Sequence, residues 1–345
     1  MFRNKNILII SPQAWGEMLL SKQHYANEIA KNGGTVYFLN PVIIDKRFNY
    51  KMEQVQNSNI YIINYTVFFI KKLKYRLFSF FSIENRKALE RIFKKKEIQI
   101  DYLWNFDNGL YFNILPFRFS KVKIFHPVDQ LRVKVDTSKY DFVFSLSEII
   151  LSKIENKNKF FINHGLSENY INFALKRIEE LNYNQPKLYE TSARKTLAYI
   201  GNLLTTAIDR TNFLNIIKSN PNIDFKLIGT HTSNNNLYNY KTQDIDSLIF
   251  IKQLISCVNV ELLGSKKDYE IIKLFSKIDG FFICYRETDF FKCDNSHKVL
   301  EYLSSGKPVY SSSLMTYNES SIIESVGLNK NNQLYDNNNI KKNNI

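Results

Sequence analysis

Short apolar runs alternate with helical stretches along the first half of the chain. The apolar runs have the length of strands, and a helix is predicted over 21–33, where it ends at Gly33. Strands that alternate with helices are typical of a parallel sheet that is covered by helices on both faces. The strands predicted in this half are 6–11, 35–41, 101–106, 122–127, 140–147 and 159–165.

The alternation stops near residue 166 and restarts at residue 196, and the polar segment between them suits a linker. The later elements are strands at 196–201, 225–229, 258–264, 280–285 and 307–313, and helices at 208–221, 266–279 and 296–306. At about 100–200 residues per domain, a chain of 345 residues has room for about two domains. We therefore predict an α/β fold with two Rossmann-like domains, an N-terminal one over 1–170 and a C-terminal one over 195–327. The linker is 171–194, and the Asn/Lys-rich tail 328–345 is expected to be weakly ordered.

The composition excludes several classes of protein. With 44% hydrophobic and 23% charged residues, the chain has the composition of a globular protein. Its three cysteines, Cys257, Cys284 and Cys293, have no CxxC spacing, which argues against a disulfide framework or a structural zinc site. No apolar run approaches the roughly 18 residues of a membrane span, and the apolar start is too short for a signal peptide. We expect a cytoplasmic protein.

The net charge of +14 is the first unusual feature. A nucleic acid, an anionic membrane surface or an anionic substrate would each attract such a chain. A bias toward Lys, Asn and Ile, as AT-rich genomes encode, is the alternative explanation. No nucleic-acid-binding signature is present, so we expect no nucleic-acid partner.

More than half of this charge lies in residues 67–96, which contain ten basic and two acidic residues. The phenylalanines interleaved with them are Phe68, Phe69, Phe78, Phe80, Phe81 and Phe93. Aromatic rings and cations on one segment suit the headgroup layer of an anionic membrane. The alternative is a helix whose phenylalanines pack inward and whose lysines are solvated.

The strongest chemical signal is in the second half, in SHKVLEYLSSGKPV (296–309). Ser296 and His297 are expected at the start of a helix, where free N–H groups suit a diphosphate. Glu301 lies one turn further in and can accept hydrogen bonds from a ribose diol. In open α/β sheets such a ligand lies at the carboxyl ends of the strands.

The ordered set of motifs resembles the GT-B glycosyltransferases of retaining family 4, also called glycosyl transferases group 1. The closest resemblance is to bacterial surface-polysaccharide enzymes of the teichuronic-acid glycosyltransferase type. The stretches that carry it are W…KQHYANEIAKNG (15–33), FVFSLSE (142–148), INHGLSENY (162–170), YIGNL (199–203), FKLIG (225–229), NVELLG (259–264) and HKVLEYLSSGKPV (297–309).

The resemblance implies two domains that face each other across a cleft, and transfer of a sugar from a nucleotide-sugar donor with retention. It also implies that no metal or other cofactor takes part. A donor of UDP or GDP type is expected on the C-terminal domain, and a glycan or lipid-linked acceptor on the N-terminal domain. By position, Glu301 holds the ribose, and His126 and Asp129 lie near the reacting sugar as catalytic residues. The residues expected at the diphosphate and donor sugar are Gly16, Gly201, Asn202, Arg210, Ser296, His297 and Lys298.

The chain departs from the family at two places. The first Glu of the family's Glu-x7-Glu pair would stand at Cys293, which leaves Asp294 or Glu287 as alternative acids. The Arg and Lys that follow the glycine strand are replaced by Asn202 and Ala207. Phosphate charge would then be met by Lys298 or Arg210.

These residues predict a glycosyltransferase of bacterial surface-glycan biosynthesis, peripheral at the inner face of the cell membrane through 67–96. The two departures keep open a non-catalytic binding or scaffolding protein of the same fold. A nucleotide-sugar epimerase is the third reading. The DID sequence at 244–246 lies in a polar loop rather than at a strand end, so it is not expected to bind a metal.

Overall fold

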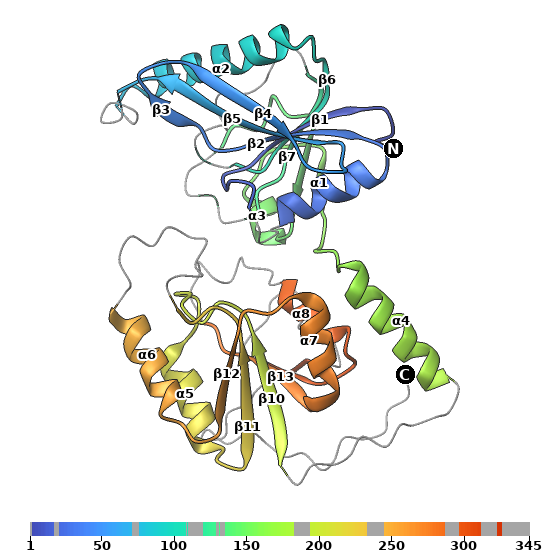
Figure 1. Ribbon diagram of the computed structural model, residues 1–345, viewed down its shortest axis with the longest axis vertical. Coiled ribbons are helices and arrows are strands. Elements are labelled where there is room, and N and C mark those ends of the chain that lie inside the picture. The colour runs from blue at the N-terminus through green and yellow to red at the C-terminus, as the bar shows by residue number, and fades with distance from the viewer. Residues whose placement is uncertain are drawn as a thin grey trace. The chain divides into compact units, whose positions relative to one another are not determined.

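The computed structural model describes residues 2–16, 21–70, 76–107, 109, 120–128, 131, 135–182, 194–232, 245–286, 297–311 and 323–325. The chain divides into two compact units, Met1–Asn163 and His164–Ile345. Each unit is built around one mainly parallel sheet (Figure 1).

The sheet of the first unit has its earliest strand near the middle. Its strands are β1 (Asn6–Ile10), β2 (Thr35–Leu39), β3 (Ile43–Asp45), β4 (Asn49–Gln54), β5 (Ile60–Phe68), β6 (Ile100–Asn105), β7 (Ser120–Phe125), β8 (Phe142–Ser145) and β9 (Lys159–Phe161). They are ordered β3-β5-β2-β1-β6-β7-β8-β9, and β4 pairs antiparallel with β5 at one edge. The strand order therefore runs outward from β1 in both directions, as in a doubly wound fold.

Helices cover both faces of this sheet. They are α1 (Ser21–Lys31), α2 (Phe78–Lys95) and α3 (Glu148–Ser152). Ala26 and Ile29 of α1 share a core with Phe38 of β2. The ring of Phe93 on α2 lies 6.1 Å from the ring of Tyr37, the preceding residue of β2. Successive side chains of a strand point to opposite faces, so α1 and α2 pack on opposite sides of the sheet.

The sheet of the second unit is wholly parallel. Its strands are β10 (Lys195–Ile200), β11 (Ile223–Ile228), β12 (Val260–Gly264), β13 (Gly280–Ile283), β14 (Val309–Ser311) and β15 (Ile323–Ser325). Their spatial order is β12-β11-β10-β13-β14-β15. Numbered within the unit this is 3-2-1-4-5-6, the order of a Rossmann fold.

The second unit also has helices on both faces, and alternate residues of β10 separate the two cores. The helices on one face are α5 (Arg210–Ser219) and α6 (Ile245–Ile255), and those on the other are α4 (Glu168–Asn182), α7 (Asp268–Leu274) and α8 (His297–Leu303). Tyr199 packs with α5 and α6, whereas Ala198 and Ile200 pack with α4, α7 and α8.

The predicted α/β class with two Rossmann-like halves is confirmed, but several elements differ from the sequence expectations. Helix α4 occupies residues that were assigned to a polar linker, and Tyr170 is buried in the core of the second unit. The apolar residues of α4 lie on both sides of the helix, with Tyr170 and Phe173 packed inward and Ile171, Leu175 and Ile178 exposed, so no single apolar face marks it in the sequence. Strand β5 and helix α6 were not predicted. The tail 328–345 lies outside the described residues.

The loops after β10 and β11 come into direct backbone contact. Gly229 has φ +147°, and a Cβ atom there would lie 1.8 Å from the carbonyl oxygen of Gly201. The amide of Gly201 donates to Ile228 at 2.9 Å, and the amide of Leu203 donates to Thr230 at 2.9 Å. Only glycine tolerates this backbone conformation and this close approach.

The Gly229→Ala substitution is therefore expected to lower the free energy of unfolding by about 3 kcal/mol or more, through strain and steric clash. Urea unfolding followed by circular dichroism measures it. Gly165→Ala is the matched control, because no heavy atom lies within 4 Å of a Cβ there. An unchanged unfolding midpoint in the Gly229 variant would contradict the close approach.

Candidate functional site

In the second sheet the order in which the chain adds strands reverses at β10, so the topological switch point lies at the carboxyl ends of β10 and β13. The chain beyond β10 folds against the chain beyond β13, where Asp209 donates its amide to the Cys284 carbonyl at 3.0 Å. Ile208 and Tyr285 form an antiparallel bridge beside this bond. Ligands of doubly wound sheets bind outside the strand ends at such a switch point.

Tyr302 fixes α8 to the end of β10. Its hydroxyl accepts the Ile200 amide at 2.8 Å and donates to the Ile200 carbonyl at 3.1 Å. The ring is fully buried and stacks on Phe281 at 4.4 Å. Gly201 follows Ile200 and Glu301 precedes Tyr302, so both predicted site residues flank this contact.

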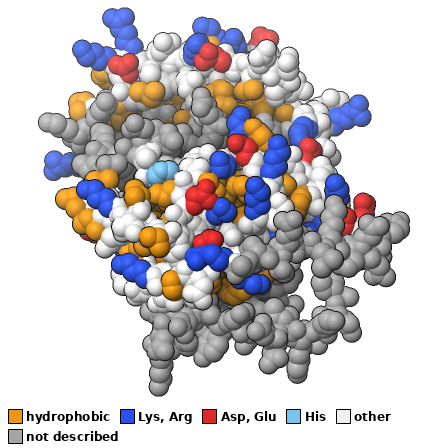
Figure 2. All heavy atoms as spheres, turned by 60° about the horizontal axis from the view of Figure 1, so that its bottom comes forward, with side chains coloured by type: hydrophobic (Ala, Val, Ile, Leu, Met, Phe, Trp, Pro, Cys, Tyr) orange, Lys and Arg blue, Asp and Glu red, His pale blue; other side chains and the backbone are white. Residues whose placement is uncertain are grey.

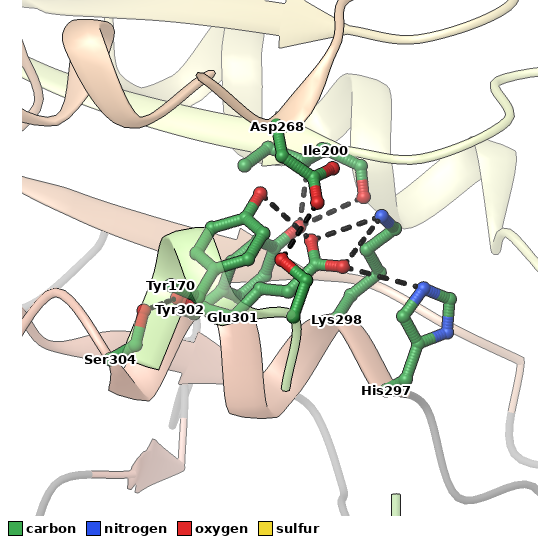
Figure 3. A network of polar contacts seen from close by, with 9 residues as sticks. Tyr170, Ile200, Asp268, His297, Lys298, Glu301, Tyr302 and Ser304 are labelled. Atoms are coloured by element: carbon green, nitrogen blue, oxygen red, sulfur yellow. Dashed lines mark hydrogen bonds and ion pairs between the residues drawn. The ribbon is translucent and has the colours of Figure 1, made fainter. Parts of the chain in front are cut away.

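Glu301 is the centre of a polar network made by three helices (Figure 3). Lys298 places its Nζ 3.1 and 3.0 Å from the two carboxylate oxygens, one turn earlier on α8. His297 Nε2 lies 3.4 Å from Oε1, and the Tyr170 hydroxyl of α4 donates to Oε2 at 3.3 Å. Asp268, the first residue of α7, accepts a hydrogen bond from Ser167 at 2.8 Å beside this group.

Burial dominates the electrostatics of Glu301, which is only 8% exposed. Loss of water raises the pKa of its carboxyl group, and the charge of Asp268 acts in the same direction. Lys298, by charge and hydrogen bond, and Tyr170, by hydrogen bond, lower that pKa without cancelling the rise. Burial also raises the pKa of Tyr170, so its hydroxyl stays a donor.

The arrangement offers an acceptor for hydroxyl groups next to a cation. The Glu301 carboxylate can accept from two neighbouring hydroxyls, and the Lys298 side chain is 24% exposed and so can still meet an anion. Asn202 uses its side-chain oxygen to accept the Leu204 amide at 3.0 Å, which shapes the turn after Gly201. These groups suit a ligand that carries a diol and a phosphate.

The structure places Arg210 away from this network. Its guanidinium donates to Ser247 of α6 at 2.6 Å and lies 5.9 Å from the Phe250 ring. Gly16 lies in the loop after β1, where nothing is within 4 Å of a Cβ position. The predicted residues outside the described part of the chain are Asp129, Ser296, Cys293, Asp294 and Glu287.

His126, predicted to lie near the reacting sugar, is fully buried in an aromatic cluster of the first unit. Its ring stacks on Phe106 at 4.8 Å, and Trp104 Nε1 donates to its Nδ1 at 3.3 Å. Its backbone amide donates to the Asn105 carbonyl at 2.8 Å. These are the surroundings of a core residue, and the catalytic role stays a prediction.

Tyr170 and Asp268 are members of the network that the sequence analysis did not single out. Tyr170 and Glu301 are 131 positions apart, so no local spacing connects them. The inward spacing of Tyr170 and Phe173 was the one signal that α4 packs on this unit.

Among the described residues, no group of three or more His, Cys, Asp or Glu side chains could hold a metal ion. No helix there is both long and apolar enough to cross a bilayer. Independence from metals stays a prediction.

The raised pKa of Glu301 predicts a pH-dependent stability difference between the wild type and Glu301→Gln. A group whose folded-state pKa is raised contributes stability below its unfolded pKa, and that contribution is lost as pH rises through the folded pKa. The wild type should therefore lose unfolding free energy relative to the variant as pH rises from about 4. Urea unfolding across that range measures it, and the exposed Glu179→Gln on α4 is the control. A difference that moves the other way would contradict the raised pKa.

No protein-family model and no curated protein matches the sequence. Similarity is found among solved structures. The chain is similar to sucrose-phosphate synthase (tll1590) from Thermosynechococcus elongatus, with a TM-score of 0.58 at 12% identity, over 91% of this chain and 83% of that one. It is similar to the E. coli trehalose-6-phosphate protein bound with UDP-2-fluoro glucose, with a TM-score of 0.59 at 10% identity, over 93% and 88%.

A third similar structure is Anabaena Alr3699/HepE in complex with UDP and glucose, with a TM-score of 0.53 at 12% identity, over 89% of this chain and 80% of that one. Structural similarity at sequence identities this low shows a shared fold and nothing about activity. The strand orders of the two units and these similarities together show that the chain has the GT-B fold, built from two Rossmann-like units.

Proposed function

We propose that the protein is a retaining, metal-independent glycosyltransferase of bacterial surface-glycan biosynthesis. It takes a sugar from a UDP or GDP donor and passes it to a lipid-linked or polysaccharide acceptor at the inner face of the cell membrane. The observation that carries the proposal is the buried Glu301 network at the switch point of the second sheet. Two structures of the same fold, one bound with UDP-2-fluoro glucose and one in complex with UDP and glucose, support it.

The described residues of this site would each bind a different part of the donor. Glu301 accepts hydrogen bonds from the two ribose hydroxyls, and Lys298, on the same helix, meets the diphosphate. Gly201 and Asn202 border the diphosphate at the end of β10. A Cβ atom at Gly201 would lie 2.8 Å from the Tyr199 hydroxyl, so glycine there makes room for that buried side chain. Positive charge at the diphosphate stabilises the leaving group as its charge develops.

A second candidate function is donor binding without transfer. Cys293 stands where the related glycosyltransferases have an acid, and Asn202 and Ala207 stand where they have cations. A protein of this kind would bind a nucleotide but would not turn over a nucleotide sugar. Product analysis with the donor present separates it from an enzyme.

Titration calorimetry with UDP, GDP, CMP and dTDP tests the donor site. We expect one nucleotide to bind, and Glu301→Ala to weaken its binding by at least about 30-fold, because two charge-assisted hydrogen bonds are lost. Glu179→Ala on α4 is the control. Binding of no nucleotide, or equal binding by the Glu301 variant, would overturn the site.

The proposed membrane contact rests on side chains at the end of β5 and the start of α2. The rings of Phe69 and Phe81 touch at 5.2 Å, which brings these two segments together. The large apolar residues around this contact that are 39–66% exposed are Phe68, Ile70, Leu77, Phe80 and Ile83. Apolar side chains of this size on a surface indicate a contact with an apolar phase or partner.

Arg86 and Lys87 lie about one turn after Ile83 on α2 and are about half exposed, and each forms an ion pair with a glutamate of the same helix. Lys and Arg side chains are scattered over the face drawn in Figure 2, so charge alone does not single out α2. The cations of this segment stand beside the exposed rings of Phe68 and Phe80, a combination that suits an anionic bilayer at roughly 1 kcal/mol per cation near the surface. Phe81 and Phe93, in contrast, are buried, so inward packing accounts for these two rings.

The double variant Phe68→Ser/Phe80→Ser should reduce co-sedimentation with phosphatidylglycerol-containing vesicles by at least about tenfold, since two rings no longer enter the bilayer. Ile249→Ser/Ile255→Ser on α6 is the matched control, because these residues are also exposed but lie outside the basic segment. Unchanged sedimentation of the phenylalanine variant would remove the membrane contact from the proposal.

A further inference from the structure

The start of α4 reaches into the Glu301 network, although it is more than 120 residues away in sequence. Tyr170 is 1% exposed, and its ring lies 6.1 Å from that of Phe275. Its hydroxyl is the one part of the side chain that meets a polar group, the Oε2 atom of Glu301, at 3.3 Å. Packing thus fixes the ring, and the ring aims the hydroxyl (Figure 3).

The start of α7 approaches the same carboxylate with a negative charge. Asp268 is held in place by the Ser167 hydroxyl, which donates to its Oδ2 at 2.8 Å. Two residues of the α4 region, Ser167 and Tyr170, therefore contact the two acids of this cluster, Asp268 and Glu301. Ser167 directly precedes α4, so both contacts come from one continuous segment of the chain.

We propose that Tyr170 and Asp268 are positioning residues that act in opposite directions on the Glu301 carboxylate and so set the affinity for the ribose diol. This inference rests on the proposed donor site at Glu301. Tyr170 donates to the ionised carboxylate and holds Oε2 in one orientation. Asp268 places a second negative charge beside it and opposes ionisation.

The ionised carboxylate is the form that matters, because it accepts from both ribose hydroxyls whereas a protonated one offers a donor in place of an acceptor. The charged or titratable groups that face it are Lys298 and His297 from α8, Tyr170 from α4, Asp268 from α7 and Tyr302 from α8. Of these, Tyr170 and Asp268 can be changed without removing the ion pair that Lys298 makes with Glu301.

The test measures nucleotide binding against pH for Tyr170→Phe and Asp268→Asn. The probe is UDP or GDP, whichever the wild type binds, with its 2′-deoxy form beside it. Tyr170→Phe keeps the packed ring and loses only the hydroxyl. It should weaken ribonucleotide binding about 3- to 10-fold near neutral pH and move the pH midpoint of binding upward. Asp268→Asn should move that midpoint downward.

Two controls separate positioning from general damage. Tyr269→Phe removes a hydroxyl from an exposed tyrosine on α7, next to Asp268, and should leave binding and its pH midpoint unchanged. The 2′-deoxy nucleotide lacks half of the diol, so the variants should change its binding much less than that of the ribonucleotide. Unfolding midpoints of all variants are measured alongside.

The outcomes are distinct. If Glu301→Gln loses binding but Tyr170→Phe and Asp268→Asn leave the pH midpoint in place, or shift it in the same direction, the positioning roles are wrong and the donor site stands. If Glu301→Gln binds as tightly as the wild type, the ribose site itself is wrong and both proposals are overturned. Opposite shifts, confined to the ribonucleotide, establish the positioning roles.

Discussion

The candidate site of the second unit depends on the Glu301 carboxylate, which the fold keeps out of water. A buried, ionised carboxylate costs several kcal/mol unless partners replace its hydration. Glu301 finds them on two helices, in the ammonium group of Lys298 and the hydroxyl of Tyr170. If this position served only the stability of the core, an apolar residue would suit it better. Val299 and Tyr302, on either side of Glu301, are core residues of that kind. The proposed ligand would account for a charge at this position that core stability alone does not require.

The position of this carboxylate follows from the sheet. Tyr302 bonds both the amide and the carbonyl of Ile200, so α8 cannot slide along β10 without breaking two buried hydrogen bonds. The same strand ends in Gly201, whose carbonyl oxygen allows no side chain at Gly229. One tyrosine thus places a carboxylate next to Gly201 at the end of β10, where the proposed diphosphate would lie.

The sequence predicted this arrangement in part, and the missing part has a physical reason. Strand β10 and the helix that carries Glu301 were predicted because short apolar runs and i, i+3 spacing are local patterns. Helix α6 was not predicted, because its apolar residues lie on exposed and buried faces alike and give no clear helical period. Tyr170 was missed because its partner is 131 residues away and the surrounding segment has a polar average composition.

His126 shows the complementary limit of sequence reasoning. A histidine at the end of an apolar strand suits both a catalytic group and a core residue, since the strand pattern is the same in either case. In the structure, Trp104, Phe106 and Tyr25 surround the ring of His126. The spacing of these residues in the sequence does not predict that they meet. Burial is a property of the packed sheet and its helices, and it appears only when all of them are in place.

The Lys298–Glu301 pair also bears on Asn202 and Ala207, which stand where the glycosyltransferases that the sequence resembles have an Arg and a Lys. Lys298 lies within 3.1 Å of both carboxylate oxygens and serves as their counter-ion. A diphosphate carries more negative charge than one carboxylate and is expected to attract the same ammonium group. Glu301 would then lose part of its neutralisation at the moment when it must stay ionised for the ribose. The Tyr170 hydroxyl cannot follow the phosphate, because its ring is packed against Phe275, and so it stays in place as a donor to the carboxylate. A chain in which one lysine serves two anions therefore has a physical reason to keep a fixed hydroxyl behind the carboxylate.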